Sequence, residues 1–384
     1  MPMNAVVEAV EVLPLSIPYP SPRRFGRHVL TSGENIVVRV RDSDGRVGLG
    51  ESIPRPYVYG ESAKSIVHAI IEWFGPAVMG RPILDIDDMW RTWDGVAANF
   101  AAKAGLDMAI HDLQAQAVGL PLWRWLGGTS QTIPLTWILT YGTSAAVCEE
   151  AVRRWSEGYS CFKVKISNDR AHDRDMLQRI RSELPETARL YADANGSLTR
   201  AEFLRRIPEL IEYGVESVED PLIPGYMESR HSLGSATQMP ILADETAKSP
   251  EEAANEIMSG AVDLFSLKIF RTGISRSRDI ARIARAFGRD CLVGGQGETQ
   301  VGAAIAAHFA SSLYAMGFDH YPAEVSSSYR FDFDTTHGGQ QLIAGSLHLS
   351  DAAGSGIVLN EEVLAKLSSA EEFGYVRRDG WCSG

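Results

Sequence analysis

The segment Cys161-Phe162-Lys163-Val164-Lys165 is a short strand-like run that ends in charge. Comparable apolar or β-branched runs end at Asp193, Glu219, Asp244 and Lys268. The steps between these four residues are 26, 25 and 24 residues long, the length of one strand, one helix and two loops. Parallel strands with this repeat form a barrel, and charged residues at their carboxyl ends meet at one mouth. This series of charged strand ends therefore predicts a TIM-type barrel with a charged site at that mouth.

Length, charge and composition exclude several classes of protein. A chain of 384 residues is too long for one ordinary core, so two domains are expected. A net charge of -12 argues against a nucleic-acid surface, which needs clustered basic residues. The longest apolar stretch, residues 301–316, contains His308 and is too short for a membrane span. Scattered cysteines without a CxxC pair, and an N-terminus without a signal-peptide pattern, favour a cytoplasmic location.

The pattern of elements divides the chain into three regions. Residues 1–130 carry a hairpin signal at Asp42-Ser43-Asp44-Gly45 followed by helical patterns, which is typical of an α+β domain. Residues 131–346 alternate strand and helix patterns and are expected to form the barrel. Residues 347–384 are expected to pack back on the first domain. The helical patterns cover 63–74, 86–93 and 98–118, and eight candidate strands cover 133–139, 161–165, 190–193, 215–219, 241–244, 264–268, 291–294 and 318–324.

Three carboxylates at consecutive strand ends predict a metal site. Asp193, Glu219 and Asp244 supply the few carboxylate oxygens that Mg²⁺ prefers, with Mn²⁺ as a possible substitute. Zinc fits less well, because no His or Cys occupies a matching position. Asn195 follows Asp193 by two residues, so it faces the same way and is a candidate for substrate binding.

Three lysines are candidates for acid–base chemistry. Lys163 and Lys165 lie two apart on one strand and therefore share its inner face. Adjacent ammonium groups disfavour each other's charge, so the pKa of one lysine is expected to fall into the range of a general base. Lys268 ends the sixth strand, across the barrel. This arrangement suits removal of a proton beside a metal-held carboxylate on one face and its return on the other. Alternatively, one lysine of the pair points outward into a salt bridge.

Taken together, these motifs resemble the enolase superfamily, in the mandelate racemase/muconate lactonizing enzyme family and its muconate lactonizing subgroup. The resemblance implies an α+β capping domain over a (β/α)₇β barrel, an enolate intermediate, a small carboxylate substrate and a homo-oligomer. Enolase-superfamily sites in general use a Lys or His base with Mg²⁺. The matching segments are Lys163-Val164-Lys165, Asp193-Ala194-Asn195, Glu219-Asp220-Pro221, Asp244-Glu245, Lys268, residues 104–112, Gly119-Leu120-Pro121 and Leu126-Gly127-Gly128.

Several positions depart from patterns known in the family. Strand six ends in Lys268 and residues 294–299 contain no His, so the His–Asp pair of mandelate racemase-like members is missing. Many subgroup members have Glu-Gln-Pro where this chain has Glu219-Asp220-Pro221. Tyr321-Pro322-Ala323-Glu324 lacks the Asp-x-Asp of dipeptide epimerases, which disfavours that activity. Glu298 and Glu324 are equally good candidates for substrate contact and for a structural role.

Two proline-rich segments of the first region are candidates for specificity. Residues 22–28 and 54–59 match the loops that close over the barrel mouth in the resembled family. Arg24, Arg55 and Tyr57 in these loops are candidates for binding a second carboxylate and a planar body. The alternative is a solvated loop whose arginines lie along the surface.

The expected activity is that of an isomerase. Muconate-type cycloisomerisation is placed slightly ahead of racemisation or epimerisation of an amino-acid derivative. A lyase is the alternative: an acid-sugar or hydroxyproline-type dehydratase, or an o-succinylbenzoate synthase. A third possibility is a catalytically silent barrel that only binds metal and ligand. The substrate itself does not follow from the sequence.

Overall fold

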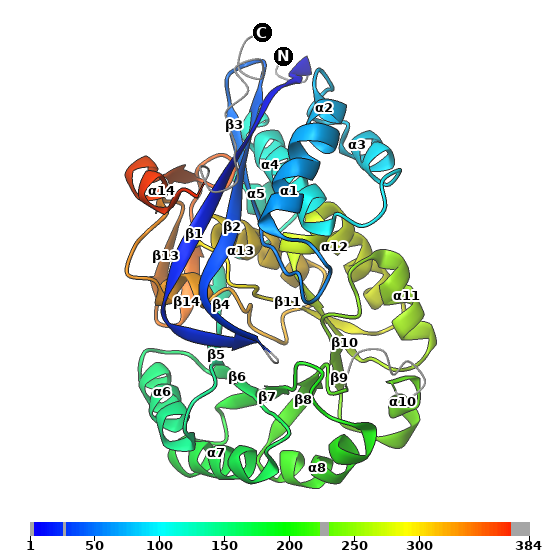
Figure 1. Cartoon of the computed structure of the whole chain (residues 1–384), viewed down its shortest axis with the longest axis vertical. Coiled ribbons are helices and arrows are strands. Elements are labelled where there is room, and N and C mark those ends of the chain that lie inside the picture. The colour runs from blue at the N-terminus through cyan, green and yellow to red at the C-terminus, as the bar shows by residue number, and fades with distance from the viewer. Residues whose placement is uncertain (1–3, 26–27, 223–229, 370–384) are drawn as a thin grey trace.

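The computed structural model describes residues 4–25, 28–222 and 230–369 (Figure 1). Its N-terminal part is an antiparallel sheet of β1 (Val7–Phe25), β2 (His28–Asp42) and β3 (Val47–Ser52), in that order. The turn between β2 and β3 is closed by a hydrogen bond from the Gly45 amide to the Asp42 carbonyl, 3.0 Å. Gly45 has φ 84°, which glycine adopts without steric cost. The predicted hairpin is confirmed.

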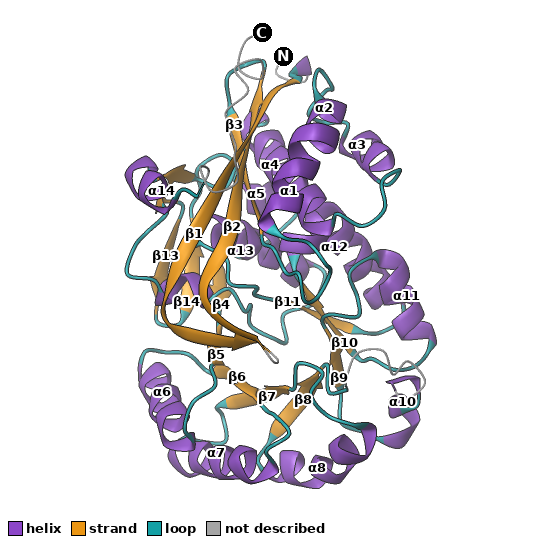
Figure 2. Ribbon diagram, in the orientation of Figure 1, coloured by secondary structure: helices purple, strands orange, loops and turns teal. Residues whose placement is uncertain are grey.

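Helices cover one face of this sheet (Figure 2). Each of the three predicted helical patterns is helical in the structure. The first is divided, because Pro76 has no amide hydrogen to donate one turn back, and the helix widens there into a π turn. The helices are α1 (Ala63–Ala69), η2 (Ile70–Phe74), α2 (Gly75–Val78), α3 (Ile86–Trp93), α4 (Phe100–Ala117) and α5 (Leu122–Trp125).

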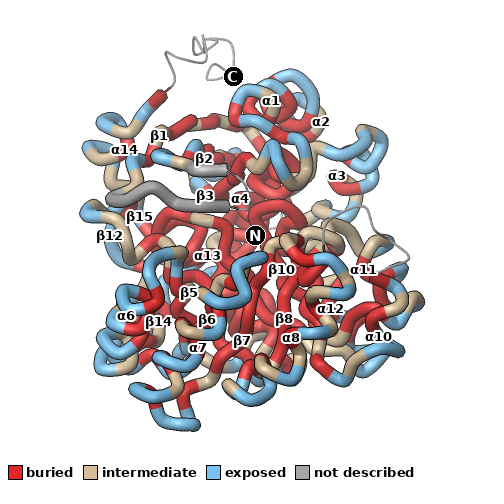
Figure 3. The backbone as a smooth tube through the Cα atoms, turned by 60° about the horizontal axis from the view of Figure 1, so that its bottom comes forward, coloured by how far each residue is buried: buried red, intermediate tan, exposed pale blue. Residues whose placement is uncertain are grey.

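Seven parallel strands form the barrel wall, in sequence order around the sheet. They are β5 (Thr136–Leu139), β6 (Cys161–Lys165), β7 (Arg189–Asp193), β8 (Val215–Glu219), β9 (Ile241–Ala243), β10 (Leu264–Leu267) and β11 (Asp290–Val293). Outside them lie α6 (Ser144–Ser156), α7 (Arg170–Glu183), α8 (Arg200–Glu212), α10 (Leu233–Ala236), α11 (Pro250–Met258), α12 (Ile269–Ala286) and α13 (Gln300–Ala315). Figure 3 shows the strands buried and the outer turns of the helices exposed.

The prediction of an eighth strand over 318–324 is wrong, because this segment forms no continuous strand. It is an isolated bridge between Leu135 and Ala323, extended by a hydrogen bond from the Glu324 amide to the Val293 carbonyl, 2.8 Å. Pro322 has no amide hydrogen, which limits the ladder this segment can form. The contacts still join β11 to β5, so the fold is the capped, TIM-type (β/α)₇β barrel that the resemblance implies.

Another predicted strand, 133–139, is divided into two. Its first part, β4 (Thr132–Pro134), leaves the barrel and pairs with β14 (Ser346–Leu349), which also pairs with β13 (Gln340–Ile343). The remaining C-terminal elements are η3 (Ser327–Arg330), β12 (Thr336–Gly338), β15 (Ile357–Leu359) and α14 (Glu361–Leu367). After α14, the Ser369 amide donates to the Pro14 carbonyl of β1, 3.0 Å. The predicted domain boundaries at 130 and 346 stay predictions.

Side chains alternate across each barrel strand, which sorts the interior into layers. Phe162 and Val164 of β6 point outward and are fully buried in the core beneath the helices. The intervening Cys161 points inward and belongs to a separate apolar cluster, formed by Cys161, Tyr191, Leu242, Leu264, Leu292 and Tyr321. Lys163 and Lys165 continue the inward face beyond Cys161. The charged site therefore lies above an apolar layer.

Buried carboxylates join the capping sheet and helices to the barrel. Asp107 of α4 accepts hydrogen bonds from the Ile274 amide (2.5 Å) and the Ser275 amide (3.1 Å) of α12. The chain turns there at Gly273, φ 65°, which presents these two amides to the carboxylate. Glu51 of β3 likewise accepts from the Thr299 amide (3.0 Å) at the start of α13. The cap is thus fixed to the barrel by helix N-termini, whose free amides need acceptors. Within the described residues, no helix is long and apolar enough to cross a membrane.

Candidate active site

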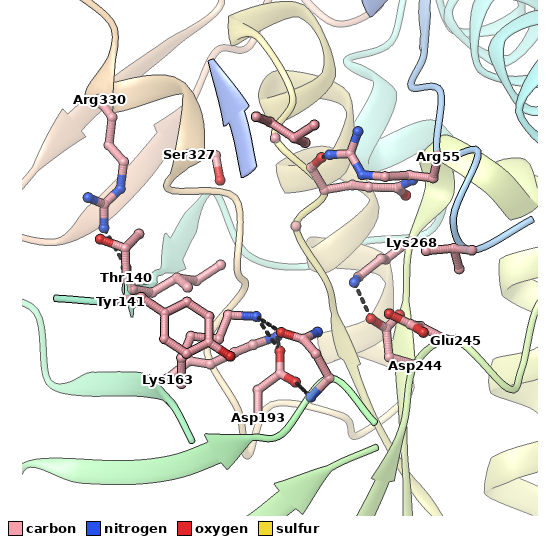
Figure 4. Close-up of a pocket in the computed structure, with 18 of the residues that line it drawn as sticks. Arg55, Thr140, Tyr141, Lys163, Asp193, Asp244, Glu245, Lys268, Ser327 and Arg330 are labelled. Atoms are coloured by element: carbon pink, nitrogen blue, oxygen red, sulfur yellow. Dashed lines mark hydrogen bonds and ion pairs between the residues drawn. The ribbon is translucent and has the colours of Figure 1, made fainter. Parts of the chain in front are cut away.

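A cavity of about 140 Å³ lies between the cap and the carboxyl ends of the barrel strands (Figure 4). The far ends of β1 and β2 reach it through Tyr19 and Leu30. The barrel contributes charged residues from four strand ends, and the loops contribute aromatic, hydroxyl and aliphatic groups. The barrel residues that line it are Ile138, Thr140, Tyr141, Lys163, Lys165, Asp193, Asn195, Asp244, Glu245, Lys268, Arg271, Gly295, Gln296, Gly297, Ser327 and Arg330, and the cap adds Arg55 and Val58.

Both lysines of β6 point inward. The alternative, in which one of them points outward into a salt bridge, is wrong. The Lys163 ammonium donates to Glu219 (2.5 Å) and to Glu324 (3.1 Å). The Lys165 ammonium donates to Asp193 (2.5 Å) and to the Asn195 amide oxygen (2.9 Å). Lys163 is almost fully buried, whereas the Lys165 side chain is 14% exposed toward the cavity. Both lysines line the cavity, and Lys165 is the more exposed of the pair.

The expectation of a lowered lysine pKa is wrong for Lys163. Burial alone would lower its pKa, but Glu219, Glu324 and Asp193 together raise it well above the ordinary value. The expectation of a lower pKa rested only on the neighbouring ammonium of Lys165. It could not count Glu324, which the closing segment of the barrel brings beneath Lys163. The surrounding carboxylates therefore favour the charged form of Lys163.

Lys268 lies on the opposite wall of the cavity. Its strand, β10, is separated from β6 by β7, β8 and β9. The Lys268 ammonium pairs with Asp244, which also forms an ion pair with Arg271 at 2.9 Å. Figure 4 shows Lys268 beside Asp244 on one side of the cavity and Lys163 beside Asp193 on the other. A small molecule in the cavity has a lysine on each side.

The carboxylates of Asp193, Glu219 and Asp244 come from neighbouring strand ends. Asp193 is the register partner of Glu219, and Asp244 follows β9 directly. Among the described residues, no three acidic, His or Cys side chains stand in a metal-coordinating arrangement. Instead the Lys163 ammonium lies between two of these carboxylates, 2.5 Å from Glu219 and 3.4 Å from Asp193. The structure therefore places the three carboxylates in one charged cluster with the lysines.

Two observations indicate that this set of donors fits a hard divalent cation. The buried Oε1 of Glu219 has no hydrogen-bond partner, and a buried carboxylate oxygen left in this way is costly. Burial and then the charge of Asp193 raise the pKa of Glu219 well above its ordinary value. Carboxylates that repel one another in a buried site are those that a cation stabilises.

The predicted substrate-binding residues separate into four groups. Asn195 and Arg55 line the cavity. Glu298 and Glu324 are fully buried and lie behind it: Glu324 accepts from Lys163 and from the Tyr191 hydroxyl (2.5 Å). Tyr57 is 52% exposed and the structure does not bring it to the cavity. The side chain of Arg24 lies outside the described residues.

Arg55 connects the cap to the barrel loop after β11. Its guanidinium donates to the Pro54 carbonyl (2.7 Å) and to the Gln296 carbonyl. Both of these acceptors are neutral carbonyls, and no carboxylate of the described residues forms an ion pair with Arg55. A cation held in this way at a cavity wall is available to an anionic group of a ligand.

Several lining residues were not predicted as site residues from the sequence. Arg271 follows Lys268 by one helical turn, and Glu245 belongs to the Asp244-Glu245 motif but was given no role in the site. Burial and then the charge of Asp220 raise the pKa of Glu245 to about 8. Arg330 lies on η3, far from any strand-end motif, and is held by Glu150 at 2.9 Å. No signal in the sequence pointed to Arg330.

Comparison with known proteins gives matches along nearly the whole chain. Residues 9–127 match the model of the mandelate racemase/muconate lactonizing enzyme N-terminal domain, and residues 146–363 match the enolase C-terminal domain-like model. The chain is 28% identical over 362 residues to the L-Ala-D/L-Glu epimerase of Bacillus subtilis, covering 91% of this chain and 96% of the relative.

Solved structures of similar shape include both cycloisomerases and epimerases. A muconate lactonizing enzyme from Mycobacterium smegmatis, complexed with muconolactone, has a TM-score of 0.91 and 28% identity and covers 95% of this chain and 100% of its own. A dipeptide epimerase from Enterococcus faecalis, complexed with Mg and a dipeptide, has a TM-score of 0.86 and 26% identity, with 92% and 99% covered. The similarity thus includes enzymes of both reaction types.

Proposed function

The chain belongs to the mandelate racemase/muconate lactonizing enzyme family of the enolase superfamily, and from this premise we propose that it is an isomerase that moves a proton alpha to a carboxylate. Enzymes of this family depend on a divalent metal. We infer that Asp193, Glu219 and Asp244 hold that metal here, as Mg²⁺. When bound, Mg²⁺ supplies positive charge for the substrate carboxylate oxygens as negative charge develops on them.

The position of Lys165 and Lys268 on opposite walls is the observation that carries this proposal. Lys165 transfers the proton at the carbon next to the carboxylate: as an ammonium it donates the proton when a lactone ring closes, and as an amine it removes the proton in racemisation or ring opening. Asn195, 2.9 Å from the Lys165 nitrogen, orients the amine. Lys163 stays charged and adds to the positive potential that stabilises the developing anion.

The remaining lining residues indicate which substrate class fits. Arg55 and Arg330 line the cavity on opposite sides in Figure 4, and Tyr19, Tyr141 and Leu30 also line it. A second carboxylate or an acyl oxygen at the far end of a substrate would meet these cations. A free ammonium group, as in a dipeptide, would be repelled by an arginine at that position. We therefore propose a muconate-like dicarboxylate and a cycloisomerase reaction, in which one proton moves at Lys165 and Lys268 balances charge.

Racemisation of an N-acylated amino acid is the second candidate. The specific observation in its favour is that Lys268 faces the cavity from the wall opposite Lys165. Racemisation needs two groups, one to remove the proton on one face and one to donate it on the other. An acylated nitrogen carries no charge, so it does not conflict with the arginines.

Incubation with substrate panels in D₂O tests the proposed reaction class. Dicarboxylates, lactones, N-acyl amino acids and dipeptides are each incubated with the enzyme and Mg²⁺ and analysed by mass spectrometry. We expect one deuterium in the lactone formed from a dicarboxylate, without loss of water. Loss of water on turnover would instead assign the enzyme to the lyases. Absence of exchange into every ligand that binds would support a catalytically silent barrel.

Replacing Arg55 with Met should raise KM for the true substrate by about 10- to 100-fold, because a buried charge-assisted hydrogen bond contributes roughly 1.5–3 kcal/mol. KM for an analogue that lacks the distal anionic group should change little. The measurement is steady-state kinetics with both compounds. Arg91→Met is the matched control, because Arg91 lies in the cap but is exposed and pairs with Asp88. Equal KM values in Arg55→Met and the unaltered enzyme would refute charge recognition by Arg55.

A further inference from the structure

Asp220, directly after the proposed metal ligand Glu219, is buried but does not line the cavity. Its backbone has φ 35°, a left-handed conformation that non-glycine residues seldom adopt. Its carboxylate Oδ2 accepts from the Glu245 amide (2.6 Å) and from the Asp244 amide (3.3 Å). The side chain of one strand end thus holds the backbone of the next strand end, at the residue that carries the third metal-binding carboxylate.

The backbone of Asp220 also contacts the strand end on its other side. Its carbonyl accepts from the Gly196 amide at 2.8 Å, in the loop that follows Asp193. Asn195 in that loop is a second non-glycine residue with positive φ, 42°. Two residues with positive φ therefore lie at the strand ends that carry the carboxylate cluster. Such conformations persist only where the surrounding contacts hold the backbone in place.

Arg230 holds the other oxygen of the Asp220 carboxylate. Its guanidinium is 3.3 Å from Asp220 Oδ1, and it also donates to the Thr246 hydroxyl (2.8 Å) and to Glu256 (3.1 Å) of α11. All of these charged groups are at least nine-tenths buried. The chain Asp220–Arg230–Glu256 thus connects the strand end of β8, the loop after β9 and the helix that follows that loop.

We propose that Asp220 is a positioning residue for the divalent cation, and that Arg230 and Glu256 fix its direction. The inference rests on the proposed metal set and deepens it, since Asp220 sets the place of Asp244 relative to Glu219. Residues that hydrogen-bond to metal ligands orient those ligands, and replacing such residues weakens metal binding.

A carboxylate is needed at position 220, because both of its oxygens accept hydrogen bonds. Asparagine has one acceptor oxygen and one NH₂ donor. Its NH₂ group would face either the two backbone amides or the Arg230 guanidinium, and each of these is a donor. Asp220→Asn therefore weakens the link to Asp244 without changing any residue that lines the cavity.

The test is calorimetric titration of the full chain with Mn²⁺ and Mg²⁺, with no substrate present. We expect Asp220→Asn to raise the dissociation constant about 10- to 100-fold, the typical effect of losing such a partner. Asp173→Asn is the matched control: Asp173 is buried, pairs with Arg206 at 2.8 Å and accepts from the Ser167 amide, but contacts none of the three carboxylates. Its dissociation constant should equal that of the unaltered protein.

The possible outcomes separate this inference from the proposed function. If the unaltered protein binds neither cation, the metal set itself is wrong. If it binds and Asp220→Asn binds equally well, the positioning role is wrong while the metal set stands. If Asp220→Asn does not fold, Glu256→Gln is used, which leaves the Asp220–Arg230 contact but removes its charged support. We expect at least about 3-fold weaker cation binding there, and an unchanged dissociation constant would overturn the inference.

Discussion

Replacing Lys165 with Ala should abolish turnover, because the group that transfers the α-proton is lost. Positioned general bases contribute about 10²- to 10⁴-fold to rate, and the loss in kcat should reach at least that range. Deuterium exchange at the α-carbon in D₂O should stop as well. The loss should appear in kcat more than in KM, since the cavity keeps Arg55 and the carboxylate cluster. Lys366→Ala, at an exposed lysine on α14 paired with Glu362, should retain full activity.

The matching change at Lys268 distinguishes the two candidate reactions. In a racemase, Lys165→Ala and Lys268→Ala should each block exchange of the α-proton of one stereoisomer. In a cycloisomerase, Lys268→Ala should slow turnover but leave exchange at the Lys165 face detectable. An active Lys165→Ala enzyme would contradict both mechanisms, because Asn195 is an amide and Lys163 is held in ion pairs with Glu219 and Glu324.

The repeated spacing of charged strand ends was sufficient to predict the barrel. Each of the runs that end at Lys165, Asp193, Glu219, Asp244 and Lys268 became a strand or its end in the structure. Alternation then predicted the inward direction of Lys163 and Lys165, since a strand that shows Phe162 and Val164 to the helices must show its other residues to the interior. Local pattern and overall fold agree in this part of the chain.

What could not be predicted depends on contacts between distant segments. Glu324 lies 161 residues from Lys163, and its position beneath that lysine reverses the expected direction of the lysine pKa. Arg330 reaches the cavity from a short helix held by Glu150, and no spacing rule relates it to the strands. Tyr57 is the opposite case, because a loop residue can turn to solvent without any change in the sequence pattern. Strand positions follow from periodicity, whereas loop residues are placed by tertiary packing.

Replacing any one of Asp193, Glu219 and Asp244 with its amide should abolish metal-dependent activity. Mg²⁺ is held by a small number of carboxylate oxygens, so the loss of one charged ligand should weaken cation binding by more than the about 10- to 100-fold expected for a supporting residue. Dialysis against a chelator should remove activity from the unaltered enzyme, and Mg²⁺ should restore it. The measurements are turnover and cation titration on the same preparations.

The fold should survive these substitutions, and Glu219→Gln shows why. Burial and the neighbouring Asp193 raise the pKa of Glu219, so a neutral amide removes repulsion there, and the amide oxygen can still accept the hydrogen bond from Lys163. Glu324→Gln is the matched control, because Glu324 belongs to the same buried cluster and contacts Lys163 but is no proposed ligand. Thermal unfolding of both variants should stay close to that of the unaltered protein, while only Glu219→Gln loses cation binding. Full turnover after exhaustive chelation would show that the three carboxylates serve only to hold the lysines.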